Sequence, residues 1–546
     1  MNISPTRAAL LLLLGVAACG PGERPASRTV VVAAVGEPPS VLPPLTYESV
    51  GRDVGDLVWE RLATLAPHGA SIDTAAYRPA LAQRWERVDS LTWRFHLRPG
   101  AQWQDGVPVT ARDVVFSFDV YADSAIDAIG RLAVASLTVS APDSATVLIR
   151  FPHASPEQLY DATYHVRIIP EHVWGSIARE EWGTDTAVAH LVGSGPFRVV
   201  SWRRGEALML GRGSRVEGRG SSAEQRIDTV VIRFVQDPDA ALNLLLSHEA
   251  DLLEVLMTPD RIVRVEADTA FRVERYPSAV YGFLAFNLAG KNRALRDREA
   301  RRTLAAAVDR DAIARNAFGP DAHAPAGPMS ALAWIGERGI SGAELDTAAG
   351  RTVKGRAAAR PFTLDILVPS TSPSRRRIAE ALQEAWRRIG VTATITAVDF
   401  PVFQERLASG KFDSYIGAYL DEPTLRGLAE QWGRAGFESQ NYGHYDNPVV
   451  DSLLALAASQ GDTAAAGPLY RQALSLLNAD APAIFLYTPM SASAFRRDIG
   501  NVTIDPYSWL ATLESWVVGR GSWVMRSPAR PARPARPARP ALLPVL

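Results

Sequence analysis

The stretch Leu91-Thr-Trp-Arg-Phe-His-Leu97 alternates strictly between apolar and polar side chains. This period of two predicts a β-strand with one buried face. Pro99-Gly100 and Asp105-Gly106, which follow it, are typical turn residues. Thr110 and Asp113 then have the spacing of a capping box, so a helix is expected directly after Thr110. The whole stretch predicts scaffold, and it contains no catalytic motif.

The residues from Leu81-Ala-Gln-Arg-Trp85 through Phe118 resemble the signature of bacterial extracellular solute-binding proteins of family 5. These proteins are the oligopeptide-, dipeptide- and nickel-binding components of ABC importers. The Gly-rich segment 192–202 and the segment 281–309 resemble the same family, and the resemblance covers roughly residues 28–516. It implies an α/β fold that is bilobal and periplasmic-binding-protein-like, of type II, in the large cluster with an extra inserted domain.

The composition is that of an ordinary globular protein of more than one domain. The formal net charge of the 546 residues is −1, and four of the arginines belong to a repeat at the carboxyl end. The rest of the chain is therefore mildly acidic, which gives no support for nucleic acid as a partner.

The amino-terminal residues have the pattern of an export signal. Arg7 precedes a short apolar run, Ala8 to Ala18, which is too short to span a bilayer. Val16-Ala-Ala-Cys19 resembles a lipobox, so residues 1–18 are predicted to be a signal peptide, Cys19 the lipidation site and 19–27 a tether. Cys19 is the only cysteine, which excludes internal disulfides. We therefore expect an exported lipoprotein, periplasmic or at the cell surface, that is anchored to the membrane and does not span it.

Residues 523–546 contain a Pro-Ala-Arg repeat and are expected to be a disordered tail. In a polyproline II helix, which has three residues per turn, the arginines would instead line one ridge and could bind an anionic surface.

The order of predicted elements divides the chain into three parts. A discontinuous domain I takes 28–55, 183–275 and 488–522, an inserted domain II takes 56–182, and a second lobe takes 276–487. Strands are expected at 28–35, 227–234, around 251–254, at 281–288, 362–368, 392–398, near 415 and at 483–487, and helices at 240–248, 297–309 and 375–389. The strand at 483–487 is expected to cross back to the first domain.

Catalytic motifs are absent from the sequence. It has no GxSxG elbow, HExxH, CxxC or Walker motif, and the Gly-rich segment 192–202 lacks the lysine of a phosphate loop, so it predicts a turn. His165 and His172 are the closest comparable histidine pair, and the resemblance implies a structural role for their segment. We expect no enzyme activity, no metal site and no cofactor.

The best binding candidate is Ile416-Gly-Ala-Tyr-Leu-Asp-Glu-Pro-Thr424. It resembles the family's Gly-x-x-x-Asp segment, whose Asp faces the cleft between the lobes and pairs with the α-amino group of a bound peptide. Gly417 and Asp421 keep that spacing, and an enclosed ammonium needs such a carboxylate. If the register is instead counted back from Pro423, Tyr419 takes the Asp position. As a further alternative, Asp421 and Glu422 are solvated loop acids.

Other candidate ligand contacts are aromatic or near the first strand. Aromatic rings offer rigid apolar area to a ligand, although each is individually expected more often in a core. Tyr47 and Glu48 follow the first strand, where the family makes backbone contacts to an extended ligand. The full set of further candidates is Tyr415, Tyr419, Trp432, Tyr442, Tyr47, Glu48, Tyr281 and Asn287. Tyr281 and Asn287 serve equally well as strand residues.

The resemblance implies a substrate-binding component of an ABC importer that captures oligo- or dipeptides and delivers them to a membrane permease with its ATPase. It implies a monomer that closes over its ligand. The same fold could bind a non-peptide solute such as a nickel chelate, haem, an oligosaccharide or an opine. A sensor or chaperone that works without a transporter is a third possibility.

Overall fold

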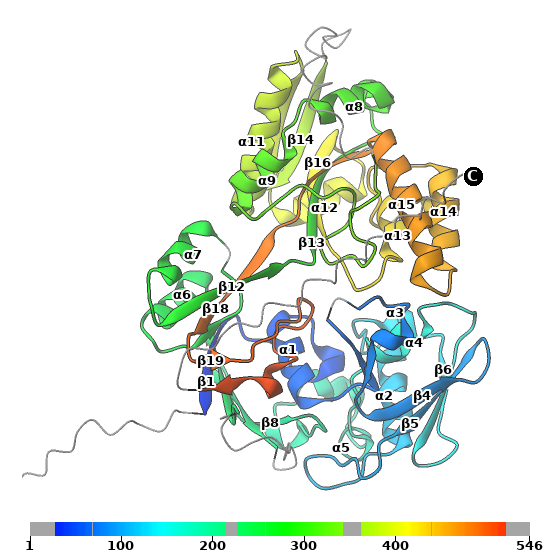
Figure 1. The fold of residues 1–546 in the computed structure, drawn as a ribbon, viewed down its shortest axis with the longest axis vertical. Helices are drawn as coiled ribbons and strands as arrows, with labels where there is room; N and C mark the ends of the chain where they lie inside the picture. Colours follow the sequence, from blue (N-terminus) through cyan, green and yellow to red (C-terminus); the bar gives the residue numbers. More distant parts are fainter. Residues whose placement is uncertain are drawn as a thin grey trace, which may run out of the picture.

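The computed structural model describes residues 28–67, 69–213, 226–256, 258–341, 362–437 and 439–519. The predicted signal peptide (1–18), the tether (19–27) with Cys19, and the predicted tail (523–546) lie outside the described residues. The described part of the chain forms two lobes, which are the lower and the upper halves of Figure 1.

A seven-stranded sheet supports the first lobe, with the strand order β12-β18-β11-β1-β10-β9-β8. The strands are β1 (Thr29–Val35), β8 (Phe197–Arg203), β9 (Ala207–Arg212), β10 (Thr229–Val235), β11 (Leu252–Leu253), β12 (Phe271–Pro277) and β18 (Met490–Arg496). β1 pairs in parallel with β10 and β11, and the remaining pairs are antiparallel. Three helices pack on this sheet: α1 (Ser49–Val58) against β8, α6 (Pro238–Leu246) against β1 and α7 (Pro259–Glu266) against β12.

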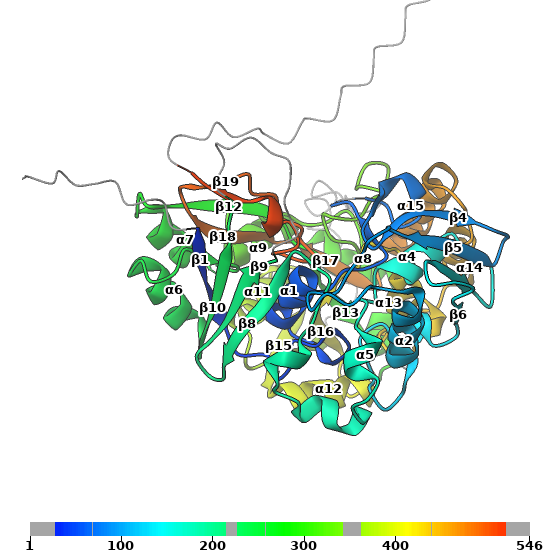
Figure 2. The same cartoon turned by 90° about the horizontal axis from the view of Figure 1, so that it is seen from below.

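A four-stranded antiparallel sheet completes the first lobe, with the order β4-β5-β7-β6. Its strands are β4 (Ala82–Arg87), β5 (Thr92–Leu97), β6 (Thr138–Ser140) and β7 (Thr146–Arg150), beside the small hairpin of β2 (Ala63–Leu65) and β3 (Tyr77–Pro79). Its helices are α2 (Ala111–Ala122), α3 (Arg131–Val134), α4 (Gln158–Thr163) and α5 (Glu171–Trp174). Helix α1 lies between the two sheets in both views (Figures 1 and 2). One continuous hydrophobic core connects them, since Val30 and Phe95 belong to the same cluster.

The stretch with the alternating pattern forms the predicted strand and helix. Trp93, Phe95 and Leu97 are buried on β5, whereas the side chains between them are partly exposed. The Thr110 N–H donates to the Asp113 carboxylate at 2.8 Å, so the capping box is present at the start of α2. Both predictions are confirmed, because each depends only on local spacing.

The predicted Gly-rich turn is also present before β8. A Cβ atom at Gly193 would lie 1.9 Å from the Val58 carbonyl oxygen, so only glycine lets the two backbones approach this closely.

The second lobe is built on a five-stranded sheet with the order β15-β14-β16-β13-β17. Its strands are β13 (Val280–Phe286), β14 (Thr363–Pro369), β15 (Thr392–Val398), β16 (Ser414–Leu420) and β17 (Ala483–Tyr487). Its helices are α8 (Arg298–Ala306), α9 (Arg310–Phe318), α11 (Pro373–Arg387), α12 (Phe400–Ala408), α13 (Gly427–Trp432), α14 (Pro448–Ala458) and α15 (Thr463–Asp480). The predicted βαβ unit is confirmed, because β14 and β15 are parallel and α11 packs against both. Separate hydrophobic clusters cover the two faces of this sheet.

The chain passes between the lobes at two adjacent places, between β12 and β13 and between β17 and β18. The Ser278 N–H donates to the Pro489 carbonyl at 3.3 Å, and the Thr488 hydroxyl donates to the Val280 carbonyl at 3.1 Å. The strand at 483–487 was expected to cross to the first domain, but it pairs with β13 inside the second lobe. The apolar side chains of β17 are divided between the two hydrophobic clusters of the second lobe, and this burial holds the strand there. The chain therefore crosses to the first lobe only before the next strand, β18.

Short elements complete the structure. They are β19 (Ile499–Gly500), β20 (Val517–Val518) and the 3-10 turns Pro43–Leu45, Thr74–Ala76, Arg179–Thr184, Val188–His190, Arg293–Arg296, Arg434–Gly436 and Leu513–Ser515. Within the described ranges, no helix combines the length and apolar character needed to cross a membrane.

Candidate functional site

A cavity of about 220 Å³ lies between the two lobes. Its first-lobe wall comes from segments around Thr46, Arg61 and Tyr164, and its second-lobe wall comes from Trp334 and the loop after β16. The segment around Tyr507, near the carboxyl end of the described chain, contributes a further side. The site is not built by elements that are adjacent in the chain. It forms only where the two lobes meet.

Asp421 stands at the first position after β16 and lines the cavity. Its backbone N–H donates to the Ala279 carbonyl at 2.7 Å, which fixes the loop against the start of β13 beside the chain crossing. Its carboxylate accepts a hydrogen bond of 2.6 Å from the Ser330 N–H. Burial raises the pKa of Asp421 to about 7, although the Ser330 hydrogen bonds oppose the shift. Among the described residues this half-buried carboxyl group has no ion pair, so it has no counter-charge when it is ionised.

Glu422 also lines the cavity, and it has no ion pair in the described part of the chain either. Its one hydrogen bond comes from the Tyr160 hydroxyl at 3.5 Å, which is long. Burial raises the pKa of Glu422, Arg426 opposes that shift, and Asp161 and Glu157 add to it. The group faces the cavity and retains solvent-accessible surface, so it is available to a ligand.

Two of the three arginines in the first-lobe wall share one carboxylate behind the wall. Arg61 and Arg167 contact the same buried carboxylate, Asp56, at 2.8 and 2.6 Å. Burial alone would raise the pKa of Asp56, but the two guanidinium groups hold it well below its usual range. The Ser508 hydroxyl donates to the same carboxylate. This cluster ties the carboxyl-terminal segment to α1, and both guanidinium groups are held at one carboxylate.

Arg52 is the cavity-lining arginine without a hydrogen-bond partner for its Nε among the described residues. Asp53 and Glu254 lie near it. Burial raises the pKa of both carboxyl groups, which are close enough to interact. The positive charge of Arg52 opposes this rise. The Nε atom is itself buried, so a ligand can reach this guanidinium only through its terminal nitrogens.

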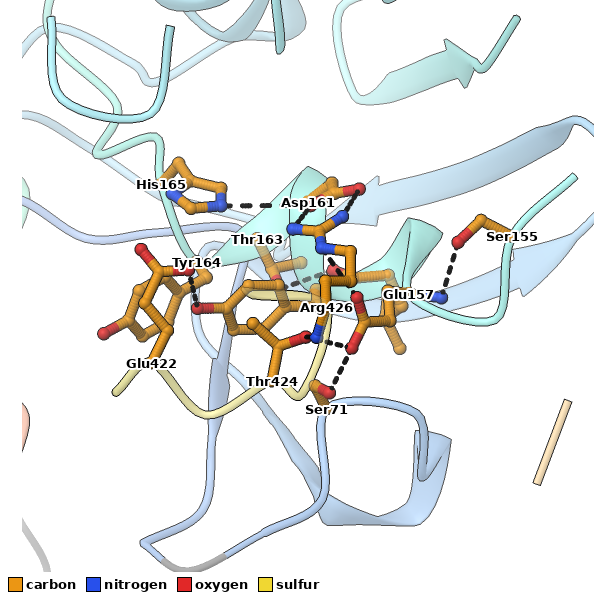
Figure 3. A network of polar contacts seen from close by, with 12 residues as sticks. Ser71, Ser155, Glu157, Asp161, Thr163, Tyr164, His165, Glu422, Thr424 and Arg426 are labelled. Atoms are coloured by element: carbon orange, nitrogen blue, oxygen red, sulfur yellow. Dashed lines mark hydrogen bonds and ion pairs between the residues drawn. The ribbon is translucent and has the colours of Figure 1, made fainter. Parts of the chain in front are cut away.

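The lobes are joined beside the cavity by an interlobe ion-pair cluster made of Arg426, Glu157 and Asp161. Arg426, from the second lobe, contacts both Asp161 oxygens at 2.8 and 2.9 Å and Glu157 at 2.8 Å (Figure 3). Glu157 also accepts hydrogen bonds from Ser71 at 2.8 Å and from Thr424. These contacts span the two lobes and hold them together.

His165 lies under this cluster and is neutral at physiological pH, because burial lowers its pKa to about 3 and the nearby arginines lower it further. No group of three or more potential metal ligands is present in the described ranges. The cavity offers carboxylates, the guanidinium group of Arg52 and aromatic rings, which suits binding of a small polar molecule.

Of the predicted site residues, the structure places only Asp421 on the cavity wall. Tyr281 and Trp432 are buried in the core of the second lobe, where the Trp432 indole donates to the Tyr281 hydroxyl at 2.9 Å. Asn287 is buried too and donates to the Gly410 and Phe412 carbonyls. These three side chains are core residues, because their polar atoms satisfy one another or the backbone.

The remaining candidates lie outside the cavity wall as well. Tyr415 is buried in the second-lobe core, and Tyr419 and Tyr442 pack against it. The Tyr419 hydroxyl donates to the Gln440 carbonyl at 2.6 Å. Tyr47 is exposed and donates to the Asp127 carbonyl, and Glu48 is the exposed residue before α1. Their neighbour Thr46 reaches the cavity.

Sequence reasoning missed most of the cavity wall. Arg52, Arg61, Tyr164, Trp334 and Tyr507 are far apart in the chain and share no spacing. Glu422 was considered only as a solvated acid. A signal was present in the last case, since two adjacent acids follow a buried strand.

The two-lobed α/β fold with an enclosed interlobe cavity defines a solute-binding protein. Residues 76–425 match the family model of bacterial extracellular solute-binding proteins, family 5 (middle part). The chain belongs to this family, whose members are binding proteins and not enzymes.

Individual relatives cover most of the chain. Protein XP55 of Streptomyces lividans is 26% identical over 511 residues, which is 89% of either chain. The periplasmic oligopeptide-binding protein of Salmonella typhimurium is 25% identical over 78% of this chain and 81% of its own. The oligopeptide-binding protein AppA of Bacillus subtilis, solved with a nonapeptide, has the same fold, with a TM-score of 0.69 and 20% identity over 91% of this chain and 99% of its own.

Proposed function

We propose that this protein captures short peptides in the cavity between its lobes and delivers them to the membrane permease of an ABC importer. The names of its relatives support the ligand class, since they include oligopeptide- and dipeptide-binding proteins. The cavity, at about 220 Å³, lies just below the range of roughly 300–1,000 Å³ usual for drug-sized ligands. A ligand of two or three residues therefore suits it better than a long peptide.

The observation that carries this proposal is the Asp421 carboxylate. It lies in an enclosed cavity without an ion pair among the described residues, and its raised pKa reports the cost of that burial. The α-ammonium of a peptide would supply the missing counter-charge. Asp421 lies on the cavity wall, whereas the Tyr419 hydroxyl is bonded to the Gln440 carbonyl. This supports the alignment in which Gly417 and Asp421, and not Tyr419, match the family's Gly-x-x-x-Asp segment. Arg52 is suited to the ligand's carboxylate or carbonyl groups.

Binding would couple to closure of the lobes. The two chain crossings at residues 277–280 and 487–490 are adjacent and form a natural hinge. We propose that 28–55, 183–275 and 488–522 move as domain I, with 56–182 packed on it as domain II, against the second lobe of 276–487. The distribution of the three larger sheets supports this division.

Calorimetric titration with alanyl di-, tri- and nonapeptides tests the proposal. We expect saturable binding of the di- or tripeptide and weaker binding of the nonapeptide, because the cavity is small. A preparation that binds none of these peptides, but that carries a co-purified non-peptide solute in native mass spectrometry, would contradict it.

The protein is further proposed to be a monomeric lipoprotein anchored through Cys19. The lipobox-like Val16-Ala-Ala-Cys19 and the family's extracellular role support this. Cys19→Ser should move the protein from the membrane to the soluble fraction, because the acyl chain has no other attachment point. Fractionation followed by immunoblotting measures this, with Ser27→Ala, at the end of the predicted tether, as a control that should remain membrane-bound. Retention of the Cys19→Ser protein in the membrane would contradict the anchor.

A further inference from the structure

The charged groups of the cavity wall are balanced in number, but they are not evenly paired. The guanidinium groups on the wall are those of Arg52, Arg61 and Arg167, and the carboxyl groups are those of Asp421, Glu422 and Asp505. Asp56, behind the wall, pairs with both Arg61 and Arg167. Asp421 and Glu422 line the cavity without an ion pair among the described residues, so a cationic ligand would find its counter-charges there.

Three of the guanidinium groups around the cavity already contact carboxylates, and the fourth, that of Arg52, lies near Asp53 and Glu254. Arg61 and Arg167 share Asp56 at 2.8 and 2.6 Å. Arg426 is the cation that lowers the pKa of Glu422. Its ion pairs, however, are with Glu157 and Asp161. The interlobe cluster thus uses the charge that would otherwise neutralise Glu422. Figure 3 shows the Glu422 carboxylate apart from the guanidinium of Arg426.

Glu422 is therefore a second anionic position in the cavity, next to Asp421 in the chain. Both residues line the cavity, and their Cα atoms, as those of consecutive residues, lie about 3.8 Å apart. A ligand residue whose α-ammonium pairs with Asp421 is therefore within a long side chain's length of Glu422. A lysine or arginine at the amino end of a peptide carries two cations: the α-ammonium and the side-chain cation. The ring of Tyr164 lines the cavity and stacks on the fully buried Tyr160, with centroids 4.6 Å apart, so Tyr164 would cover the aliphatic part of that side chain.

We propose that the cavity selects short peptides whose first residue is basic, with Glu422 binding the side-chain cation while Asp421 binds the α-ammonium. This inference rests on the proposed function and names the substrate class of the same site. Glu422 is exposed to solvent in the open mouth of the cavity. A bound peptide with a neutral first side chain would displace that water without pairing the carboxylate, which is the physical reason for selectivity.

Calorimetry with matched dipeptides tests it. Arg-Ala and citrullyl-Ala have nearly the same shape, and they differ in the charge of the first side chain. The wild-type protein should bind Arg-Ala at least tenfold more tightly than citrullyl-Ala. In Glu422→Gln, the affinity for Arg-Ala should fall by at least tenfold and that for citrullyl-Ala should change by less than threefold. Glu405→Gln, an exposed glutamate on α12, should leave both affinities unchanged.

Failures of the two proposals are distinguishable. If the wild-type protein binds both dipeptides with the same affinity, the selectivity is overturned and peptide binding stands. If Glu422→Gln weakens the binding of both dipeptides equally, Glu422 does not discriminate between their charges, and the inference is again overturned. If neither dipeptide nor any other short peptide binds, the proposed function falls, and this inference falls with it. Circular dichroism confirms that each variant is folded.

Discussion

Asp421→Ala should weaken peptide binding by roughly 2–5 kcal/mol, because the ligand's ammonium would be enclosed without its counter-charge. Asp421→Asn is the sharper variant, since its side-chain oxygen can still accept from the Ser330 N–H and preserve the loop. Calorimetric titration with the tightest short peptide measures both. Asp446→Ala, an exposed acid outside the cavity, is the control and should bind as the wild type does. Unchanged affinity in both Asp421 variants would contradict the role of this carboxylate.

The affinity should also depend on pH. Burial raises the pKa of Asp421 in the free protein to about 7, the Ser330 hydrogen bonds oppose that rise, and Tyr507 is close enough to interact with the carboxylate. The ammonium binds the ionised form, so below pH 7 binding must release a proton. The affinity should then fall by up to tenfold per pH unit towards pH 5 and be nearly constant above pH 8. Asp421→Asn should lose this part of the dependence. If the affinity of Asp421→Asn varies with pH as steeply as that of the wild type, another group is responsible for the pH dependence.

Arg426→Ala should shift the unliganded protein towards an open form. It leaves Glu157 and Asp161, whose side chains are only 6% and 10% exposed, facing the second lobe without their cation. Removing one partner of a buried ion pair costs several kcal/mol, but the Arg426 side chain is 37% exposed and is screened by solvent. We therefore expect the closed arrangement to lose about 2 kcal/mol, which is roughly a thirtyfold change in the closed-to-open ratio.

Small-angle scattering without ligand measures this shift as an increase in the radius of gyration. Arg376→Ala, on the exposed face of α11, is the matched control and should leave the scattering curve unchanged. Saturating peptide should restore the compact form of Arg426→Ala, since ligand binding favours closure. A scattering curve of Arg426→Ala identical to that of the wild type would show that the interlobe ion-pair cluster does not control the lobes.

Local patterns predicted the scaffold well. The alternation in 91–97 became β5, and the Thr110–Asp113 spacing became the cap of α2. The order of elements at 362–398 became the parallel β14–α11–β15 unit. These outcomes depend on the period of a strand or helix and on turn chemistry, all of which are encoded within a few residues. The expectation that the strand at 483–487 crosses back to the first domain was wrong, because its apolar run shows that it is buried but not with which strand it pairs.

The site was predicted less well, and for a related reason. The aromatic residues at 281, 419 and 432 were candidate contacts because an aromatic ring suits either a ligand or a core. In the structure they pack together, and their polar atoms find partners within the second lobe. The cavity is lined instead by residues such as Arg52, Tyr164 and Tyr507, which come together only when the lobes meet.

By itself, the sequence determined the class of fold, the family and one wall residue, Asp421, because short-range spacing carries that information. Only the tertiary structure decided which charges are already paired. Asp56 forms ion pairs with Arg61 and Arg167, and Asp161 forms an ion pair with Arg426, which is 265 positions away in the chain. Ion pairing depends on distance in space, so the electrostatic character of the cavity follows from how the lobes pack and cannot be read along the chain.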